Sequence, residues 1–170
     1  MNTLLTAPDI EYLKGQQMKL DEEIIEKHGL TNEEWEYDLE DNHIIALRVE
    51  VAEFVNCTYD HWKYWKKKPI DRDRIIDEAV DVIHFIMLHL NKERYQVSTE
   101  DFVQSIVDLM PYKNKEITFI LNIMLVSTTC NEIMACLLFV LDHYNFTTQD
   151  IIDAYNRKNK ENFERLESGY

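Results

Sequence analysis

Apolar side chains recur at every third or fourth position along most of this chain, which is the spacing of one face of an α-helix. The first such stretch follows Asp9, and its face consists of Ile10, Leu13, Gln17, Leu20 and Ile24. Gly29 is a helix stop signal. The pattern predicts a first helix of about 18 residues, followed by a short helical turn in the acidic residues 31–41.

Two further helices are predicted on either side of an aromatic and basic connector. The spacing of Ile44, Leu47, Val51 and Phe54 predicts a helix over residues 42–57. The connector YDHWKYWKKKP then ends at Pro69, and the next apolar stripe predicts a helix over residues 71–93 with Asp71 as its N-cap.

The C-terminal half repeats the helical pattern. A short helix is predicted to start within residues 98–101 and to stop near Pro111. Residues 115–144 predict one or two helices, because residues 127–129 (Ser-Thr-Thr) offer a break, and Thr147 or Thr148 caps a last helix that runs to about Leu166. No linker or fixed repeat is visible, so we expect one all-α domain over residues 1–170, a bundle of about five to seven helices.

Composition agrees with this pattern and excludes several classes of function. The 170 residues include only three glycines and three prolines, and 45% are hydrophobic. The net charge of −14 argues against nucleic-acid binding, because that affinity comes largely from Lys and Arg. Three cysteines without a CxxC pair argue against a disulfide framework and favour a reducing cytoplasm.

The N-terminus lacks the pattern of a signal peptide. Residues 117–141 are interrupted by Asn122, Asn131 and Glu132, which favours a buried helix over a membrane span.

Two carboxylate pairs lie in apolar helical stretches. Glu50 and Glu53 occur in IIALRVEVAEFVNC, and Glu78 and Asp81 occur in IIDEAVDVIHFIML. A single pair of this kind is common on a helix surface, but four carboxylates near apolar groups repel one another and resist ionisation unless cations compensate them. Oxygen ligands without Cys or His at matching positions favour two Mg²⁺ or Mn²⁺ ions over Zn²⁺. His84, one turn after Asp81, is either a partner of the metal ligands or a core or surface histidine.

The last predicted helix carries a narrow polar stripe. Lys158, Asn162 and Arg165 are spaced i, i+4 and i+7, so they share one face. Lysine and arginine can take the phosphate oxygens that metal ions leave free. In an acidic protein this stripe predicts a bound phosphate chain whose charge the metal ions help to neutralise.

Together these features resemble the all-α nucleoside triphosphate pyrophosphatases, and within them the dimeric dUTPases of certain phages. The resemblance rests on ExxE at Glu50, on ExxD beginning 25 residues after Glu53, and on the closing KxxxNxxRxxxxY that ends at Tyr170. Gln17 and Asp21 fall in QMKLD, and HWKYWKKKP resembles the FKxW segment with Lys63 and Trp65 retained and Trp62 in place of Phe. Residues 95–145 match no motif.

The resemblance implies hydrolysis of dUTP to dUMP and pyrophosphate by water attacking the α-phosphorus. It implies two or more Mg²⁺ ions, with Mn²⁺ as a substitute, held by Glu50, Glu53, Glu78 and Asp81. Glu53, or next Glu50, would deprotonate the water. The implied substrate contacts are Gln17, Asp21, Lys63 and Trp65 at the nucleoside and Lys158, Asn162, Arg165 and Tyr170 at the phosphates. We expect the amide of Gln17 to offer the uracil edge both a donor and an acceptor.

The resemblance further implies a homodimer, and part of the apolar stretch 117–141 is its expected interface. A phage enzyme would work in the host cytoplasm. Two alternatives stay open. One is a MazG-like or dCTP pyrophosphatase with the same metal cluster, and the other is an interaction module that binds a protein such as a repressor through its acidic surface and residues 95–145.

Overall fold

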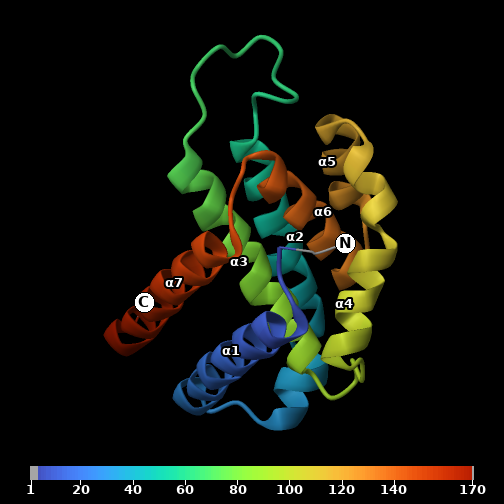
Figure 1. The fold of residues 1–170 in the computed structure, drawn as a ribbon. Coiled ribbons are helices and arrows are strands. Elements are labelled where there is room, and N and C mark those ends of the chain that lie inside the picture. Colours follow the sequence, from blue (N-terminus) through green and yellow to red (C-terminus); the bar gives the residue numbers. More distant parts are fainter. Residues whose placement is uncertain (1–3, 170) are drawn as a thin grey trace.

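The computed structural model describes residues 4–169, which contain helices and no β-strand (Figure 1). The all-α prediction is confirmed. A π-helical turn, η1 (Glu34–Asp38), precedes the second helix, and a 3₁₀ turn, η2 (Met110–Asn114), follows the fourth. The α-helices are α1 (Ala7–His28), α2 (Glu40–Cys57), α3 (Arg72–Asn91), α4 (Thr99–Asp108), α5 (Ile117–Val126), α6 (Cys130–His143) and α7 (Thr148–Ser168).

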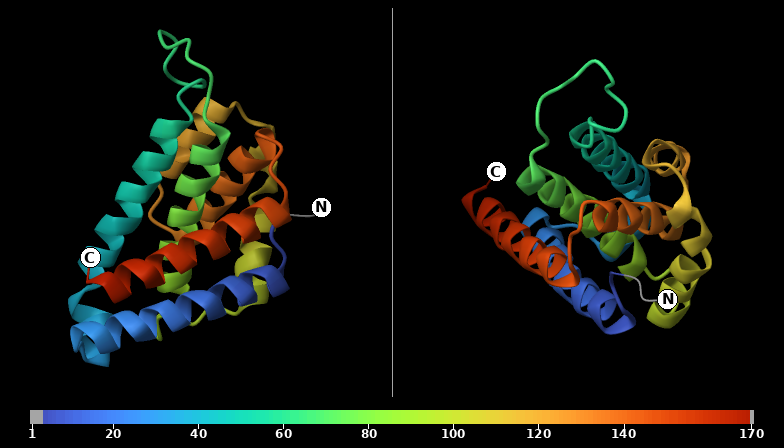
Figure 2. Two further views of the ribbon diagram at one scale, coloured as in Figure 1. Left: turned by 90° about the vertical axis from the view of Figure 1, so that its left-hand side faces the viewer. Right: turned by 45° about the horizontal axis from the view of Figure 1, so that its top comes forward.

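Helix α3 is the centre of the bundle. It packs against α1, α2, α6 and α7, and its side chains are buried on most sides between residues 75 and 90. Helices α1 and α7 run side by side and cross α3 together (Figure 2). The two helices run parallel. Tyr12 donates to Asn156 in their N-terminal halves, and Lys27 donates to the Leu166 carbonyl near their C-terminal ends.

Most helix ends lie where capping residues predict them. Gly29 adopts a left-handed conformation at φ 62° and ends α1. Asp71 caps α3 and Thr147 caps α7 through their side chains. Residues 127–129 separate α5 from α6, so the long apolar segment forms two helices.

The starts of α1 and α2 differ from the predicted positions. Helix α1 begins at Ala7 and not after Asp9, because Thr6 is the N-cap. Asp9 instead closes a capping box, where its carboxylate accepts from the Thr6 N–H at 2.8 Å and from the Thr6 hydroxyl at 2.6 Å. Helix α2 begins at Glu40, two residues before the predicted start, because the Glu40 carboxylate accepts from the buried Lys92 ammonium at 2.8 Å. This ion pair ties the start of α2 to the end of α3.

The predicted buried helix at residues 117–141 is largely confirmed. Residues 133–141 of α6 are all buried in the core of the bundle, whereas α5 keeps an exposed apolar face. Within residues 4–169, no helix combines the length and the apolar composition that crossing a membrane requires. The aromatic and basic connector, residues 58–71, extends from the end of the bundle in Figure 1.

Candidate active site

Three carboxylates meet between α2 and α3. Glu50 of α2 and Glu78 and Asp81 of α3 each place one oxygen within 4.8 Å of the others. All three side chains are half-buried. Val51 of α2 and Val82 of α3, each next to one of these carboxylates in sequence, are buried in the core. The three carboxylates are only half-buried and lie at the edge of this apolar contact. The sequence spacing and the packing of α2 on α3 together create the cluster.

Two cations compensate part of this negative charge. The Lys158 ammonium of α7 lies 2.7 Å from Asp81, and the Arg74 guanidinium lies 3.0 Å from Glu78. Glu50 forms no ion pair within the described residues 4–169, and burial, followed by the charges of Asp81, Glu53 and Glu78, raises its pKa to about 7. Burial also raises the pKa of Asp81, although Lys158 opposes this change. The three carboxylates therefore keep an excess of negative charge, which a hard divalent cation would neutralise.

Glu53 lies beside this cluster and not within it. Its side chain is exposed, and it is absent from the group whose oxygens lie within 4.8 Å of one another. Its charge still contributes to the raised pKa of Glu50, so the two carboxylates are neighbours. Of the four predicted metal ligands, the structure brings three together and places the fourth next to them.

A cleft of about 400 Å³ opens beside the cluster between α1, α2, α3 and α7. Its wall contains charged and polar side chains, namely Glu50, Asp81, Lys158, Asn162 and Arg165. It also contains apolar side chains, namely Leu20, Ile24, Phe85, Leu88 and Leu166. Gln17 and His84 lie between α1 and α3 in the same wall. A site that combines apolar side chains with carboxylates and cationic side chains suits a nucleoside that carries phosphates.

A hydrogen-bond network fixes Gln17, which is 3% exposed. Its Nε2 donates to Asp21 Oδ1 at 2.7 Å, and its Oε1 accepts from the Tyr155 hydroxyl at 3.1 Å. Oε1 also lies 2.7 Å from His84 Nδ1. Both ends of the Gln17 amide therefore have partners within the protein.

The family comparison decides between the enzyme classes that this geometry admits. A family model described as dUTPase matches residues 9–170, which is nearly the whole chain. The chain belongs to the all-α dUTPase family. It is a dUTP diphosphatase that hydrolyses dUTP to dUMP and pyrophosphate. A comparison with curated proteins gives no significant match.

Some predicted substrate contacts of this dUTPase lie outside the cleft. Lys63 and Trp65 belong to the connector and do not line the cleft. The Lys63 ammonium donates to Asn56 Oδ1 at 2.8 Å and lies over the Trp62 ring, while Trp65 is 62% exposed. Asp21 is buried, and burial raises its pKa to about 7. It lines a neighbouring pocket and reaches the cleft only through Gln17. Tyr170 lies outside the described residues.

Sequence reasoning missed one residue of the dUTPase cleft and one residue behind it. Phe85 lies in the cleft wall. Tyr155 is fully buried, donates to Gln17 and stacks on His84 with a centroid distance of 4.0 Å. Tyr155 precedes Lys158 by three residues and therefore lies near the same face of α7. That spacing was a usable signal.

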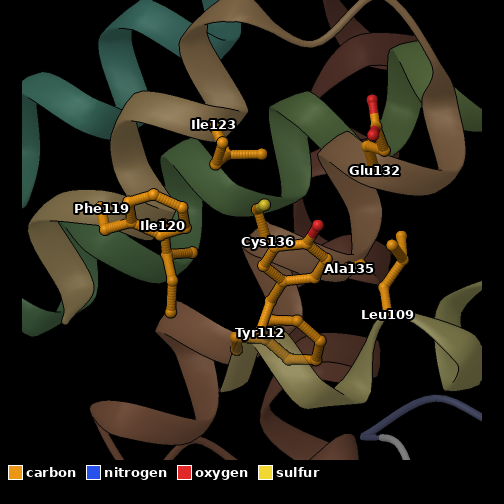
Figure 3. A pocket seen from close by; sticks show the side chains of 9 residues that line it. Leu109, Tyr112, Phe119, Ile120, Ile123, Glu132, Ala135 and Cys136 are labelled. Atoms are coloured by element: carbon orange, nitrogen blue, oxygen red, sulfur yellow. The ribbon is translucent and has the colours of Figure 1, made fainter. Parts of the chain in front are cut away.

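A smaller cavity lies in the region without motifs (Figure 3). It measures about 60 Å³ between η2, α5 and α6. Tyr112, Phe119 and Ile123 contribute apolar groups, and Glu132 and Cys136 contribute polar ones. No Lys or Arg lines it, and it is far smaller than the cleft. The cleft is therefore the better candidate for the dUTPase active site.

Proposed function

We propose that this dUTPase depends on Mg²⁺, which Glu50, Glu78 and Asp81 hold beside the cleft. The proposal rests on three half-buried carboxylate oxygens within 4.8 Å of one another and on the absence of sulfur or nitrogen from this donor set. Such an all-oxygen set suits two Mg²⁺ ions, with Mn²⁺ as a substitute, and Glu53 lies close enough to complete it. When bound, the ions lower the pKa of water and neutralise phosphate charge.

Glu53 is our proposed general base. Its exposed carboxylate is adjacent to the cluster and can accept a proton from the attacking water. The water oxygen bonds to the α-phosphorus, the bond from that phosphorus to the bridging oxygen breaks, and pyrophosphate leaves. Glu50 is the second candidate, because burial and the neighbouring carboxylates raise its pKa to about 7.

The remaining side chains of the cleft position the substrate. Lys158, Asn162 and Arg165 bind the phosphate chain, and we assign Tyr170 to the same contact because it follows Arg165 on the chain. Gln17 and the apolar wall hold the base, and Asp21 acts through Gln17. Lys63 and Trp65 can reach the nucleoside only if the connector moves or a second subunit supplies them.

The first prediction concerns the metal and the base. We expect pyrophosphate release from dUTP with Mg²⁺ and none with EDTA, and we expect Glu53→Gln to lower kcat by about 10²–10⁴-fold because it cannot accept the proton. The measurement compares dUTP, dCTP, dTTP and UTP. Glu23→Gln on the exposed surface of α1 is the matched control and should leave kcat unchanged.

Each other outcome has a definite meaning. Turnover in EDTA would refute the metal dependence. Preferred turnover of dCTP would favour the related pyrophosphatase, and turnover of no nucleotide would favour the interaction module with residues 95–145 as its surface. Full activity in Glu53→Gln would transfer the role of base to Glu50.

We also propose that two copies of the chain associate through α2 and α5. Ile45 and Val49 of α2 are 61% and 47% exposed, and Leu125 and Val126 of α5 are 49% and 74% exposed. Because these helices pack against each other, we infer that the four side chains form one apolar surface. Helix α6, the other part of the expected interface, is buried in the core of its own chain between residues 133 and 141.

Sedimentation at micromolar concentration should therefore show a dimer. The double variant Val49→Glu/Val126→Glu should be monomeric, because two carboxylates per chain would have to be buried without partners. Val97→Glu, at a residue that is 46% exposed on the segment between α3 and α4, is the control and should remain dimeric. A monomeric wild-type protein would contradict the proposal.

A further inference from the structure

Arg74 pairs with Glu78 across one turn of α3. Its guanidinium Nε donates to Glu78 Oε1 at 3.0 Å. The Arg74 side chain is 54% exposed, whereas the Glu78 side chain is only 14% exposed. The guanidinium therefore reaches the carboxylate cluster from the solvent side, where it has room to turn.

The carboxylate of Glu53, our proposed general base, has no such partner. Its side chain is exposed, and within residues 4–169 it forms no hydrogen bond and no ion pair. An exposed glutamate samples several rotamers, and holding one of them costs conformational entropy. A general base must nevertheless lie within hydrogen-bond reach of the water from which it takes a proton. Another group should therefore orient Glu53 during the reaction.

The packing of α2 on α3 brings Arg74 to the same level as Glu53. The two helices are antiparallel, because the start of α2 is tied to the end of α3 and Glu50 then meets Glu78 further along. Glu53 lies about 4.5 Å beyond Glu50 along α2, and Arg74 lies about 6 Å from Glu78 in the same direction along α3. The hydrogen bond and the charge of Glu78 raise the pKa of Arg74 most, and the charge of Glu53 adds to this effect. Both observations make Arg74 a cationic neighbour of Glu53.

We propose that Arg74 is a positioning residue that changes its carboxylate partner when the metal site fills. It gives up Glu78 to the divalent cation and turns to Glu53, whose carboxylate it then holds beside the cluster. The inference rests on the proposed metal centre and on Glu53 as the base. Arginine suits this role because its planar guanidinium can pair with a carboxylate through two N–H groups. Filling of the metal site and orientation of the base are thereby linked.

The position of Arg74 separates its role from that of Lys158. Lys158 lines the cleft and lies at Asp81, so it can reach the phosphate chain. Arg74 does not line the cleft. It acts on the carboxylates and not on the substrate, so its loss should change kcat and leave KM for dUTP nearly unchanged.

The change of partner can be observed without turnover. The ¹⁵N NMR signal of the Arg74 Nε–H group, assigned by its loss in Arg74→Lys, should be the same in the wild type and in Glu53→Gln when EDTA is present. With saturating Mg²⁺ and no nucleotide, the wild-type signal should shift, and its new position should differ from that in Glu53→Gln. A signal that Mg²⁺ leaves unchanged, or that is identical in the two proteins with Mg²⁺, would overturn the proposal.

Metal binding to the nucleotide-free protein provides a second readout. Arg74→Met removes a competitor for Glu78, so calorimetric titration should find Mg²⁺ binding about two- to fivefold tighter. Arg157→Met is the matched control, because Arg157 is 51% exposed and pairs with Asp77, the residue before Glu78. The control should keep the affinity of the wild type. Equal or weaker Mg²⁺ binding in Arg74→Met would overturn the proposal.

Kinetics tests the effect on the base. In Arg74→Met, kcat for dUTP should fall by about 10- to 100-fold, because Glu53 is no longer oriented. Arg74→Lys should recover part of kcat, since an ammonium can still pair with Glu53. Arg157→Met should keep both kcat and KM. A lower Tm with unchanged kcat in Arg74→Met would show a merely structural arginine and overturn the proposal.

These outcomes separate the inference from the proposed function. Full activity in Glu53→Gln would overturn Glu53 as the base and, with it, the role proposed for Arg74. Mg²⁺-dependent turnover that requires Glu53, together with an Arg74 signal that never responds to Glu53, would overturn the role of Arg74 alone.

Discussion

Glu50→Gln is expected to lower kcat for dUTP by about 10³-fold or more while making the metal-free protein more stable above neutral pH. The activity falls because the variant loses a charged oxygen from the set that Glu50, Glu78 and Asp81 present to the metal. The stability rises because glutamine keeps the size of the side chain and removes its charge. These two effects have opposite signs, which distinguishes a functional carboxylate from a structural one.

The pH dependence follows from the raised pKa of Glu50. Its ordinary value is 4.5, and burial with the neighbouring carboxylates raises it to about 7 in the folded protein. Below pH 4.5 the group is protonated in both the folded and the unfolded state. Between these values the unfolded state loses its proton first, so the metal-free wild type loses stability as the pH rises toward 7. Glu50→Gln should lack this contribution.

Calorimetry at pH 5, 7 and 8.5 with EDTA, and again with Mg²⁺, measures this difference. The Tm advantage of Glu50→Gln should grow with pH in EDTA and disappear or reverse in Mg²⁺, because only the wild type gains the full metal site. Glu23→Gln should follow the wild type throughout. A Glu50→Gln protein that is less stable in EDTA at pH 8.5, or that keeps more than about a tenth of kcat, would contradict the assignment.

The sequence predicts the features of this site that depend on one helix. The i, i+3 spacing of Glu78 and Asp81 and the i, i+4, i+7 spacing of Lys158, Asn162 and Arg165 place each group on one face. Capping chemistry likewise predicts where α3 and α7 begin. These properties are local, so they hold before the helices have packed.

Features that depend on the packing of several helices could not be predicted. Residues three apart on a helix differ by about 60° in direction. This difference is enough for α3 to meet Glu50 while Glu53 stays exposed. The contacts among Gln17, His84 and Tyr155 join α1, α3 and α7. The spacing of residues in the sequence does not predict which atom of the Gln17 amide faces α3 or α7. The connector illustrates the same limit, since its motif gave residue types for Lys63 and Trp65 but no position relative to the cleft.

Lys158→Met is expected to have the opposite effect on stability. The Lys158 ammonium lies 2.7 Å from Asp81, and the two side chains are only 15% and 22% exposed. Removing it leaves Asp81 beside Glu50 and Glu78 with less positive charge nearby, so the metal-free protein should lose roughly 5 °C in Tm. Mg²⁺ should restore most of this loss. Lys160→Met, whose side chain is 80% exposed one turn away from Glu164, is the matched control and should show no change.

The decisive property of Lys158→Met is that its metal affinity and its activity should change in opposite directions. Lysine competes with a divalent cation for Asp81, so the Mg²⁺ concentration at half-maximal stabilisation should decrease in the variant. Yet kcat/KM for dUTP should fall by about 10²–10³-fold, because the same ammonium no longer binds the phosphate chain. Lys158→Arg should recover part of that loss. Weaker Mg²⁺ binding in Lys158→Met would show that the lysine supports the metal site. We propose instead that the Lys158 ammonium stays beside Asp81 until metal and substrate bind. It then moves from the Asp81 carboxylate to the phosphate chain.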